Sequence, residues 1–262
     1  MIKIDTLEKT SFHKIHKSFS QAFSDYSEPF DLSQEQLRTM IERRGYKPEL
    51  SFGAFYGENL VGFTLNGIGK WNGLLTAYDT GTGIIKEFRK KGIAGRLFKE
   101  SLPVLRQNDV KQYLLEVIKT NTGAFHLYQK SGFKIVRELD YYVDLKSNIH
   151  FDYTSINVNL NIQEIAEPDW ELFKSFWDIS PSWQNSIDSI NRKFNDFIIL
   201  GIYENSALCG YGIIEKDTGD IPQLAVHPSY RRKKVATTLL YFLHLHNRNK
   251  SIKFINLDNK YI

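Results

Sequence analysis

The sequence repeats one stretch of its chain: Ile84-Ile85-Lys86-Glu87-Phe88-Arg89-Lys90-Lys91-Gly92-Ile93-Ala94 returns as Val226-His227-Pro228-Ser229-Tyr230-Arg231-Arg232-Lys233-Lys234-Val235-Ala236. The two copies keep a constant offset, 231 − 89 = 142. The preceding segments also correspond, because Gly62-Phe63 resembles Gly210-Tyr211. A repeat that carries its neighbouring elements with it indicates two related domains rather than one large domain.

Hydrophobic periodicity predicts strands and helices around the first copy. The predicted strands are Ile2–Asp5, Ser51–Tyr56, Leu60–Gly67, Thr76–Ile85, Tyr113–Ile118 and a closing hairpin of Phe133–Val136 with Tyr141–Leu145. The predicted helices are Phe12–Phe23, Ser33–Glu42, one that starts at Gly92 and is shortened or kinked by Pro103, and Asn121–Lys130. Several consecutive strands followed by helices indicate an α/β (α+β) fold rather than a strict alternation.

The polar, Asn-rich stretch 147–159 is the predicted linker between domains 1–146 and 160–262. The second domain begins again with a strand at Asn161–Ile165, and its helices are predicted at Asp169–Trp177 and Pro181–Phe194. Its sequence ends where a last helix and strands are expected, so we interpret this domain as degenerate or truncated at its C-terminus.

Composition excludes several classes of protein. The chain has 262 residues, of which 42% are hydrophobic, and this apolar content excludes intrinsic disorder. The net charge of +4 is too balanced to indicate nucleic-acid binding. No apolar run approaches the ~20 residues of a membrane span, and the N-terminus lacks the core of a signal peptide, so we expect a cytoplasmic protein without membrane contact. The single cysteine, Cys209, excludes an internal disulfide and a Cys-based zinc site.

The motif Arg89-x-x-Gly92-x-Ala94 joins a predicted strand to a predicted helix. The first N–H groups of a helix have no partner within the helix, and the helix dipole adds positive charge there. Small residues let the backbone approach an anion closely, and the basic side chains add full charges. The turn therefore predicts a site for a pyrophosphate.

A second block follows at Leu115-Glu116-Val117-x-x-x-Asn121-x-x-Ala124-x-x-Leu127-Tyr128-x-x-x-Gly132-Phe133. Together with the turn, it resembles the GNAT N-acetyltransferase family. The resemblance implies two GNAT-like domains, each with a mixed, mostly antiparallel central sheet flanked by helices. It also implies acetyl-CoA as co-substrate, held by Gly83, Ile84, Ile85, Arg89, Lys90, Lys91, Gly92, Ile93, Ala94, Gly95, Arg96 and Asn121.

The resemblance implies that Tyr128 is the general acid of a direct attack by a primary amine on the thioester. A phenol with an ordinary pKa of ~10 is a suitable donor to a thiolate, and nearby positive charge would lower that pKa further. The general base is either Glu116, which matches the base of family members acting on protein N-termini, or Asp79 on the preceding strand. The reaction requires no metal.

Catalysis is expected from the first domain only, because Lys234 stands where the family has glycine and no counterpart of Tyr128 exists. The acceptor is expected to be a small-molecule amine, a peptide N-terminus or a lysine, bordered by Tyr26, Glu28, Phe30 and Trp71, and the protein to be a monomer or homodimer. The alternative is a non-catalytic acyl-CoA-binding or ligand-sensing module on the same fold.

Overall fold

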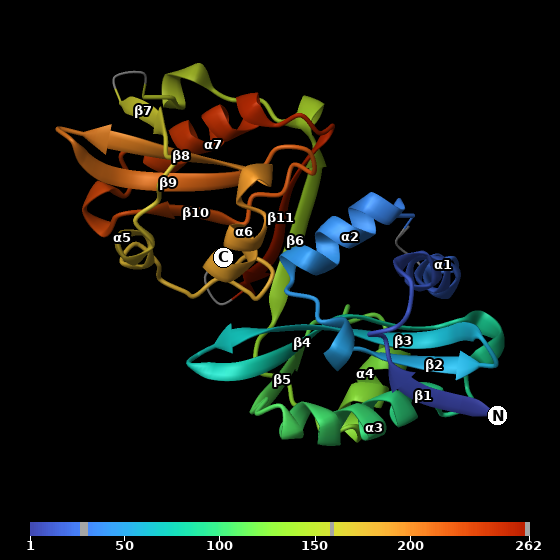
Figure 1. Cartoon of the computed structure of the whole chain (residues 1–262). Coiled ribbons are helices and arrows are strands. Elements are labelled where there is room, and N and C mark those ends of the chain that lie inside the picture. The colour runs from blue at the N-terminus through green and yellow to red at the C-terminus, as the bar shows by residue number, and fades with distance from the viewer. Residues whose placement is uncertain (27–30, 158–159, 260–262) are drawn as a thin grey trace. The chain divides into compact units, whose positions relative to one another are not determined.

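The computed structural model describes residues 1–26, 31–157 and 160–259 (Figure 1). The chain divides into two compact units, Met1–Ile135 and Val136–Ile262. Within the described residues, every helix is too short or too polar to cross a membrane.

The first unit is built on a five-stranded sheet in the order β1-β2-β3-β4-β5. All neighbouring strands are antiparallel except β4 and β5, which are parallel. Helices α1 and α2 lie on one face of this sheet, and α3 and α4 on the other (Figure 1). The elements are β1 (Ile2–Thr6), α1 (Phe12–Phe23), α2 (Gln34–Arg43), β2 (Phe52–Tyr56), β3 (Asn59–Trp71), β4 (Leu74–Ile84), α3 (Ile93–Gln107), β5 (Gln112–Leu115) and α4 (Thr122–Lys130).

Local sequence explains where the first helices begin. Ser11 caps α1 by accepting from the N–H of Lys14. Ser33 and Gln36 form a reciprocal capping box at the start of α2. The apolar stripe of α1, including Ile15 and Phe19, then packs into the core against β3. Helix α3 continues through Pro103 to Gln107, so the proline does not shorten it.

Strands β4 and β5 separate part-way along their length, and this separation creates space for a site. Their pairing ends at Asp79 opposite Leu115, whereas β4 continues to Ile84. Beyond Asp79, β4 remains paired with β3 on one side only within the described residues. Among the described residues no strand covers the other edge, although the carbonyls of Thr80 and Ile84 accept from Arg44 and Arg89.

The second unit repeats this order of elements as far as α3. Its four-stranded antiparallel sheet has the order β10-β9-β8-β7, and a separate ribbon pairs β11 with β6. The elements are β6 (Leu139–Leu145), β7 (Asn161–Glu164), α5 (Trp170–Lys174), α6 (Ile187–Arg192), β8 (Phe197–Glu204), β9 (Ala207–Glu215), β10 (Gln223–Val226), α7 (Val235–His246) and β11 (Ser251–Asp258).

The strand register confirms that the two units share one fold. Ile84 pairs with Gly62 in the first unit, and Val226 pairs with Gly210 in the second. Each repeated motif thus leaves its sheet at the same place relative to the preceding strand.

Two predicted elements were wrong. The stretch Phe133–Val136 forms no strand, and β6 pairs with β11 instead. The helix predicted over Pro181–Phe194 begins only at Ile187, because Ser186 supplies the N-cap and the preceding loop buries Trp183.

Candidate active site

The basic turn leads from β4 to the N-terminus of α3. Gly92 is the N-cap of α3 in a left-handed conformation, with φ of 72°, which favours glycine. A Cβ atom at Gly92 or at Gly95 would meet no atom within 4 Å. The first intrahelical hydrogen bond runs from Arg96 N to Gly92 O, so the N–H groups of residues 93–95 precede the helical ladder. The turn is an open anion cradle.

A cavity of about 560 Å³ extends from this turn along the open edge of β4. Its walls come from the end of α1, from β4, from the start of α3 and from the segment that leads into α4. The residues that line it are Ala22, Phe23, Asp25, Tyr26, Thr82, Gly83, Ile84, Phe88, Arg89, Lys90, Gly92, Ile93, Ala94, Gly95, Ile118, Thr120, Asn121, Gly123, Ala124, Leu127 and Tyr128.

Most of the predicted cofactor residues line this cavity, but three do not. Ile85 lines a neighbouring groove instead. Lys91 donates to the carbonyl of Glu87, and Arg96 pairs with Glu100. The predicted residues that do line the cavity are Gly83, Ile84, Arg89, Lys90, Gly92, Ile93, Ala94, Gly95 and Asn121.

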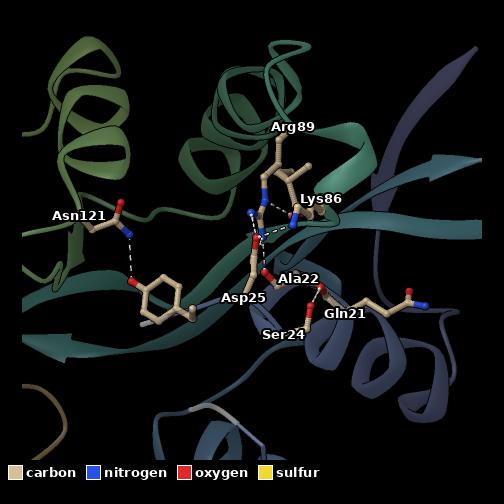
Figure 2. A network of polar contacts seen from close by, with 9 residues as sticks. Gln21, Ala22, Ser24, Asp25, Lys86, Arg89 and Asn121 are labelled. Atoms are coloured by element: carbon tan, nitrogen blue, oxygen red, sulfur yellow. Dashed lines mark hydrogen bonds and ion pairs between the residues drawn. The ribbon is translucent and has the colours of Figure 1, made fainter. Parts of the chain in front are cut away.

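The guanidinium of Arg89 is engaged by the protein itself (Figure 2). Both of its terminal nitrogens donate to the Asp25 carboxylate, at 2.7 and 2.8 Å. It also donates to the carbonyls of Ala22 at 2.8 Å and Ile84 at 3.0 Å. Asp25 in turn lies 3.8 Å from the Lys86 ammonium, and these cations lower its pKa. Arg89 therefore clamps the end of α1 to the turn.

The second unit contains the same clamp. Arg231 pairs with Asp178 at 2.9 Å and donates to the carbonyls of Phe176 and Val226. Lys234, at the N-cap of α7, adopts the left-handed conformation of Gly92, with φ of 65°. Its ammonium donates to the carbonyl of Thr154 at 2.6 Å.

Asn121 spans the cavity between α4 and α1. Its Oδ1 caps α4 by accepting from Ala124 N at 3.1 Å, and its Nδ2 donates to the hydroxyl of Tyr26 at 2.9 Å (Figure 2). Tyr26 thus lines the cavity, and its place beside the acceptor stays a prediction. Trp71 ends β3 and is not among the cavity residues, while Glu28 and Phe30 lie outside the described residues.

Tyr128 lines the cavity and contacts Asp79, which is buried and is not among the cavity residues. The Tyr128 hydroxyl donates to Asp79 Oδ2 at 3.4 Å. Asp79 is only 7% exposed, and burial raises its pKa to about 6. Burial, followed by the charge of Asp79, raises the pKa of Tyr128 well above its ordinary value. From the sequence, nearby positive charge was a possible reason for a lowered Tyr128 pKa. In the structure this pKa is raised instead.

Thr82 is a site residue that sequence reasoning missed. It lines the cavity, and its hydroxyl donates to Asp79 Oδ2 at 2.7 Å. The available signal was its position on β4, three residues after Asp79 and next to the predicted cofactor strand. Glu116, in contrast, follows the end of β5, is half-buried and is not among the cavity residues.

The second unit replaces this polar group with apolar residues. At the same offset of 142, Ile221 stands for Asp79 and Leu224 for Thr82. Ile221 is 1% exposed and belongs to the core of that unit. Among the residues described up to 259, β11 is the last element, and no helix corresponds to α4. Among the described residues, the first unit brings an anion cradle and a phenol to one cavity, with a buried carboxylate in contact with the phenol.

Curated relatives match parts of the chain. The protein named N-alpha-acetyltransferase 60 from Danio rerio is 33% identical over 100 residues, which are 37% of this chain and 40% of that protein. N-alpha-acetyltransferase 30 from Schizosaccharomyces pombe is 29% identical over 123 residues, which are 46% of this chain and 79% of that protein. The chain therefore spans less than half of the Danio rerio relative.

A solved tandem GNAT protein from the clavulanic acid biosynthesis pathway has a similar structure, with a TM-score of 0.70 over 98% of this chain and 90% of that chain. At 14% identity, this likeness concerns the fold alone. The sequence pattern of the Acetyltransferase (GNAT) family matches residues 12–133 and 160–259, one stretch for each repeat. The chain therefore belongs to the acetyltransferase (GNAT) family and carries two consecutive copies of its fold.

Proposed function

We propose that the protein transfers an acetyl group from acetyl-CoA to a primary amine, and that the first unit performs the reaction. The observation that carries this proposal is the single cavity that joins the anion cradle of α3 to the hydroxyl of Tyr128 and, through it, to Asp79. The acceptor is a small-molecule amine, a peptide N-terminus or a lysine. The similarity to N-alpha-acetyltransferases supports a peptide N-terminus.

The residues of the cavity fit acetyl-CoA. The free N–H groups at the start of α3 and the exposed ammonium of Lys90 would hold its pyrophosphate. The end of β4 at Gly83 and Ile84, which β5 does not cover, would face the pantetheine arm, and Asn121 also lines this cavity. When bound, this co-substrate supplies an activated acetyl thioester.

The chain's own groups provide acid–base chemistry. Tyr128 keeps its proton because its pKa is raised, so its hydroxyl is available as donor to the departing thiolate. Asp79, with a pKa of about 6, is ionised at neutral pH and is the carboxylate that takes up the proton lost by the substrate ammonium. Glu116 is the alternative base, but it lacks a position in the cavity wall.

The function is tested by measuring CoA release from acetyl-CoA with a panel of small amines, lysine and short peptides. We expect turnover by the wild-type protein. We expect Gly92→Lys to raise the KM for acetyl-CoA at least about tenfold, because its side chain enters the cradle. The converse change in the second unit, Lys234→Gly, is the matched control and should leave this KM unchanged. A wild-type protein that binds acetyl-CoA but acetylates no amine would support the non-catalytic alternative.

Replacing Arg89 by lysine tests whether Arg89 holds α1 against the turn or binds the phosphate directly. Lysine keeps the charge but loses the fork that binds Asp25 and two carbonyls at once. We therefore expect Arg89→Lys and Asp25→Asn each to raise the KM for acetyl-CoA, by about tenfold.

The second unit again offers the matched control, because Arg231→Lys disrupts the equivalent clamp of that unit. It should leave the KM unchanged. If Arg89 instead bound the pyrophosphate directly, Asp25→Asn would release it for that role and the KM would stay the same or fall.

A further inference from the structure

Asp79 cannot reach a substrate by itself. It is 7% exposed and is not among the residues that line the cavity. Its Oδ1 accepts from the N–H of Gly81 at 2.9 Å, and its Oδ2 faces the hydroxyls of Thr82 and Tyr128. A proton that leaves the cavity for Asp79 must therefore pass through one of these two hydroxyls.

The groups around Asp79 differ in their capacity to carry that proton. Arg44 stabilises the carboxylate by its charge but remains a cation. Tyr113 is half-buried, and its hydroxyl donates to Asn66. Tyr128 is assigned to the leaving thiolate. Thr82 is half-buried, lines the cavity and makes the shortest contact with Asp79 Oδ2, at 2.7 Å.

We infer that Thr82 is a catalytic residue that relays the proton of the acceptor ammonium to Asp79. This inference rests on the proposed function, which places the amine beside β4. The Thr82 hydroxyl has two lone pairs. The Thr82 hydroxyl also contacts Thr64 Oγ at 3.1 Å and the hydroxyl of Tyr128, so a substrate N–H takes the place of one of these two contacts when it approaches Thr82 Oγ.

The protons balance as follows. The ammonium gives a proton to Thr82 Oγ while Thr82 gives its own to Asp79 Oδ2, which frees the nitrogen lone pair for attack on the acetyl carbon. When the carbon–sulfur bond breaks, Tyr128 protonates the sulfur. Asp79 then returns its proton to the Tyr128 oxygen across the 3.4 Å contact. The second proton lost by the nitrogen passes to solvent.

The relay is tested first in the protein without substrates. Thr82→Val keeps the shape of the side chain but removes the hydroxyl, whereas Thr82→Ser keeps the hydroxyl. The pKa of Asp79, measured from its carboxyl carbon by NMR, should be about 6 in the wild type. It should rise by about one unit in Thr82→Val, because the ionised form loses a donor, and stay near 6 in Thr82→Ser. Thr80→Val is the matched control, since the Thr80 hydroxyl bonds to the carbonyl of Leu65 instead.

The second measurement is the pH profile of kcat for the same variants. If Thr82 only adjusts the pKa of Asp79, the acid limb of the Thr82→Val profile moves to higher pH. The kcat of this variant then reaches the wild-type value at high pH. A relay leaves a deficit of at least about tenfold even where Asp79 is fully ionised, and Thr82→Ser recovers most of it. Wild-type kcat for folded Thr82→Val at high pH would overturn the relay while the proposed function stands. A wild-type protein without transferase activity would overturn both.

Discussion

Tyr128→Phe is expected to lower kcat by about 100-fold while leaving the affinity for acetyl-CoA nearly unchanged. The substitution removes one oxygen and keeps the ring, which packs edge-to-face against Phe98 and Phe133. The cavity wall therefore persists and the thiolate loses its proton donor. A loss confined to kcat, with constant affinity, is the signature of an interaction made only in the transition state.

The measurement requires attention to pH. The Tyr128 hydroxyl is one of the donors to Asp79, so its removal raises the pKa of that carboxyl and moves the acid limb of the profile upward. The comparison belongs at pH 8 or above, where Asp79 is ionised in both proteins. Because the pKa of Tyr128 is raised, the wild type should show no basic limb from this residue. Unchanged kcat at saturating acetyl-CoA would remove Tyr128 from the mechanism.

The parts of the site that sequence reasoning located depend on local geometry. Gly92 is favoured by a left-handed backbone at a helix start, and Asn121 caps the helix that carries Tyr128. Such signals are contained within a few residues, so a motif and its spacing are enough to predict them. The repeat likewise predicted two units of one fold without any knowledge of contacts.

The parts that it missed depend on contacts between distant residues. Arg89 was expected to face the pyrophosphate, but Asp25, 64 positions earlier, engages it. Strand propensity predicted Tyr141–Leu145, yet only the structure shows that it pairs with Ser251–Asp258. A sequence pattern can predict a strand, but it does not identify the strand with which it pairs, because any free strand edge offers the same backbone groups.

The raised pKa of Asp79 also depends on tertiary packing. This pKa provides a second, independent way to test whether Asp79 or Glu116 is the general base. A carboxyl whose pKa is about 6 when folded and 3.8 in its ordinary state binds its proton more tightly in the folded protein. This group therefore favours folding when protonated. Its contribution to the stability of the folded protein is lost as the pH rises through 6. At neutral pH the buried, ionised carboxylate destabilises the fold.

Asp79→Asn should consequently lose activity and gain stability in one step. The neutral amide removes the buried charge, which is worth up to about 3 kcal/mol for a shift of about two units. The melting temperature of the variant should exceed that of the wild type at pH 8, and the difference should vanish below about pH 4. The kcat should fall by about 100-fold or more, because the amide accepts no proton.

Glu116→Gln is the matched comparison, since it makes the same chemical change on the other candidate base. With Asp79 as the base, Glu116→Gln retains kcat within about threefold and keeps the acid limb of the wild type. The reverse outcome, in which Asp79→Asn is stabilised but active and Glu116→Gln is inactive, would assign the base to Glu116 and reduce Asp79 to a strained structural group. Stability and activity together thus distinguish a carboxylate that is buried for catalysis from one that is merely buried.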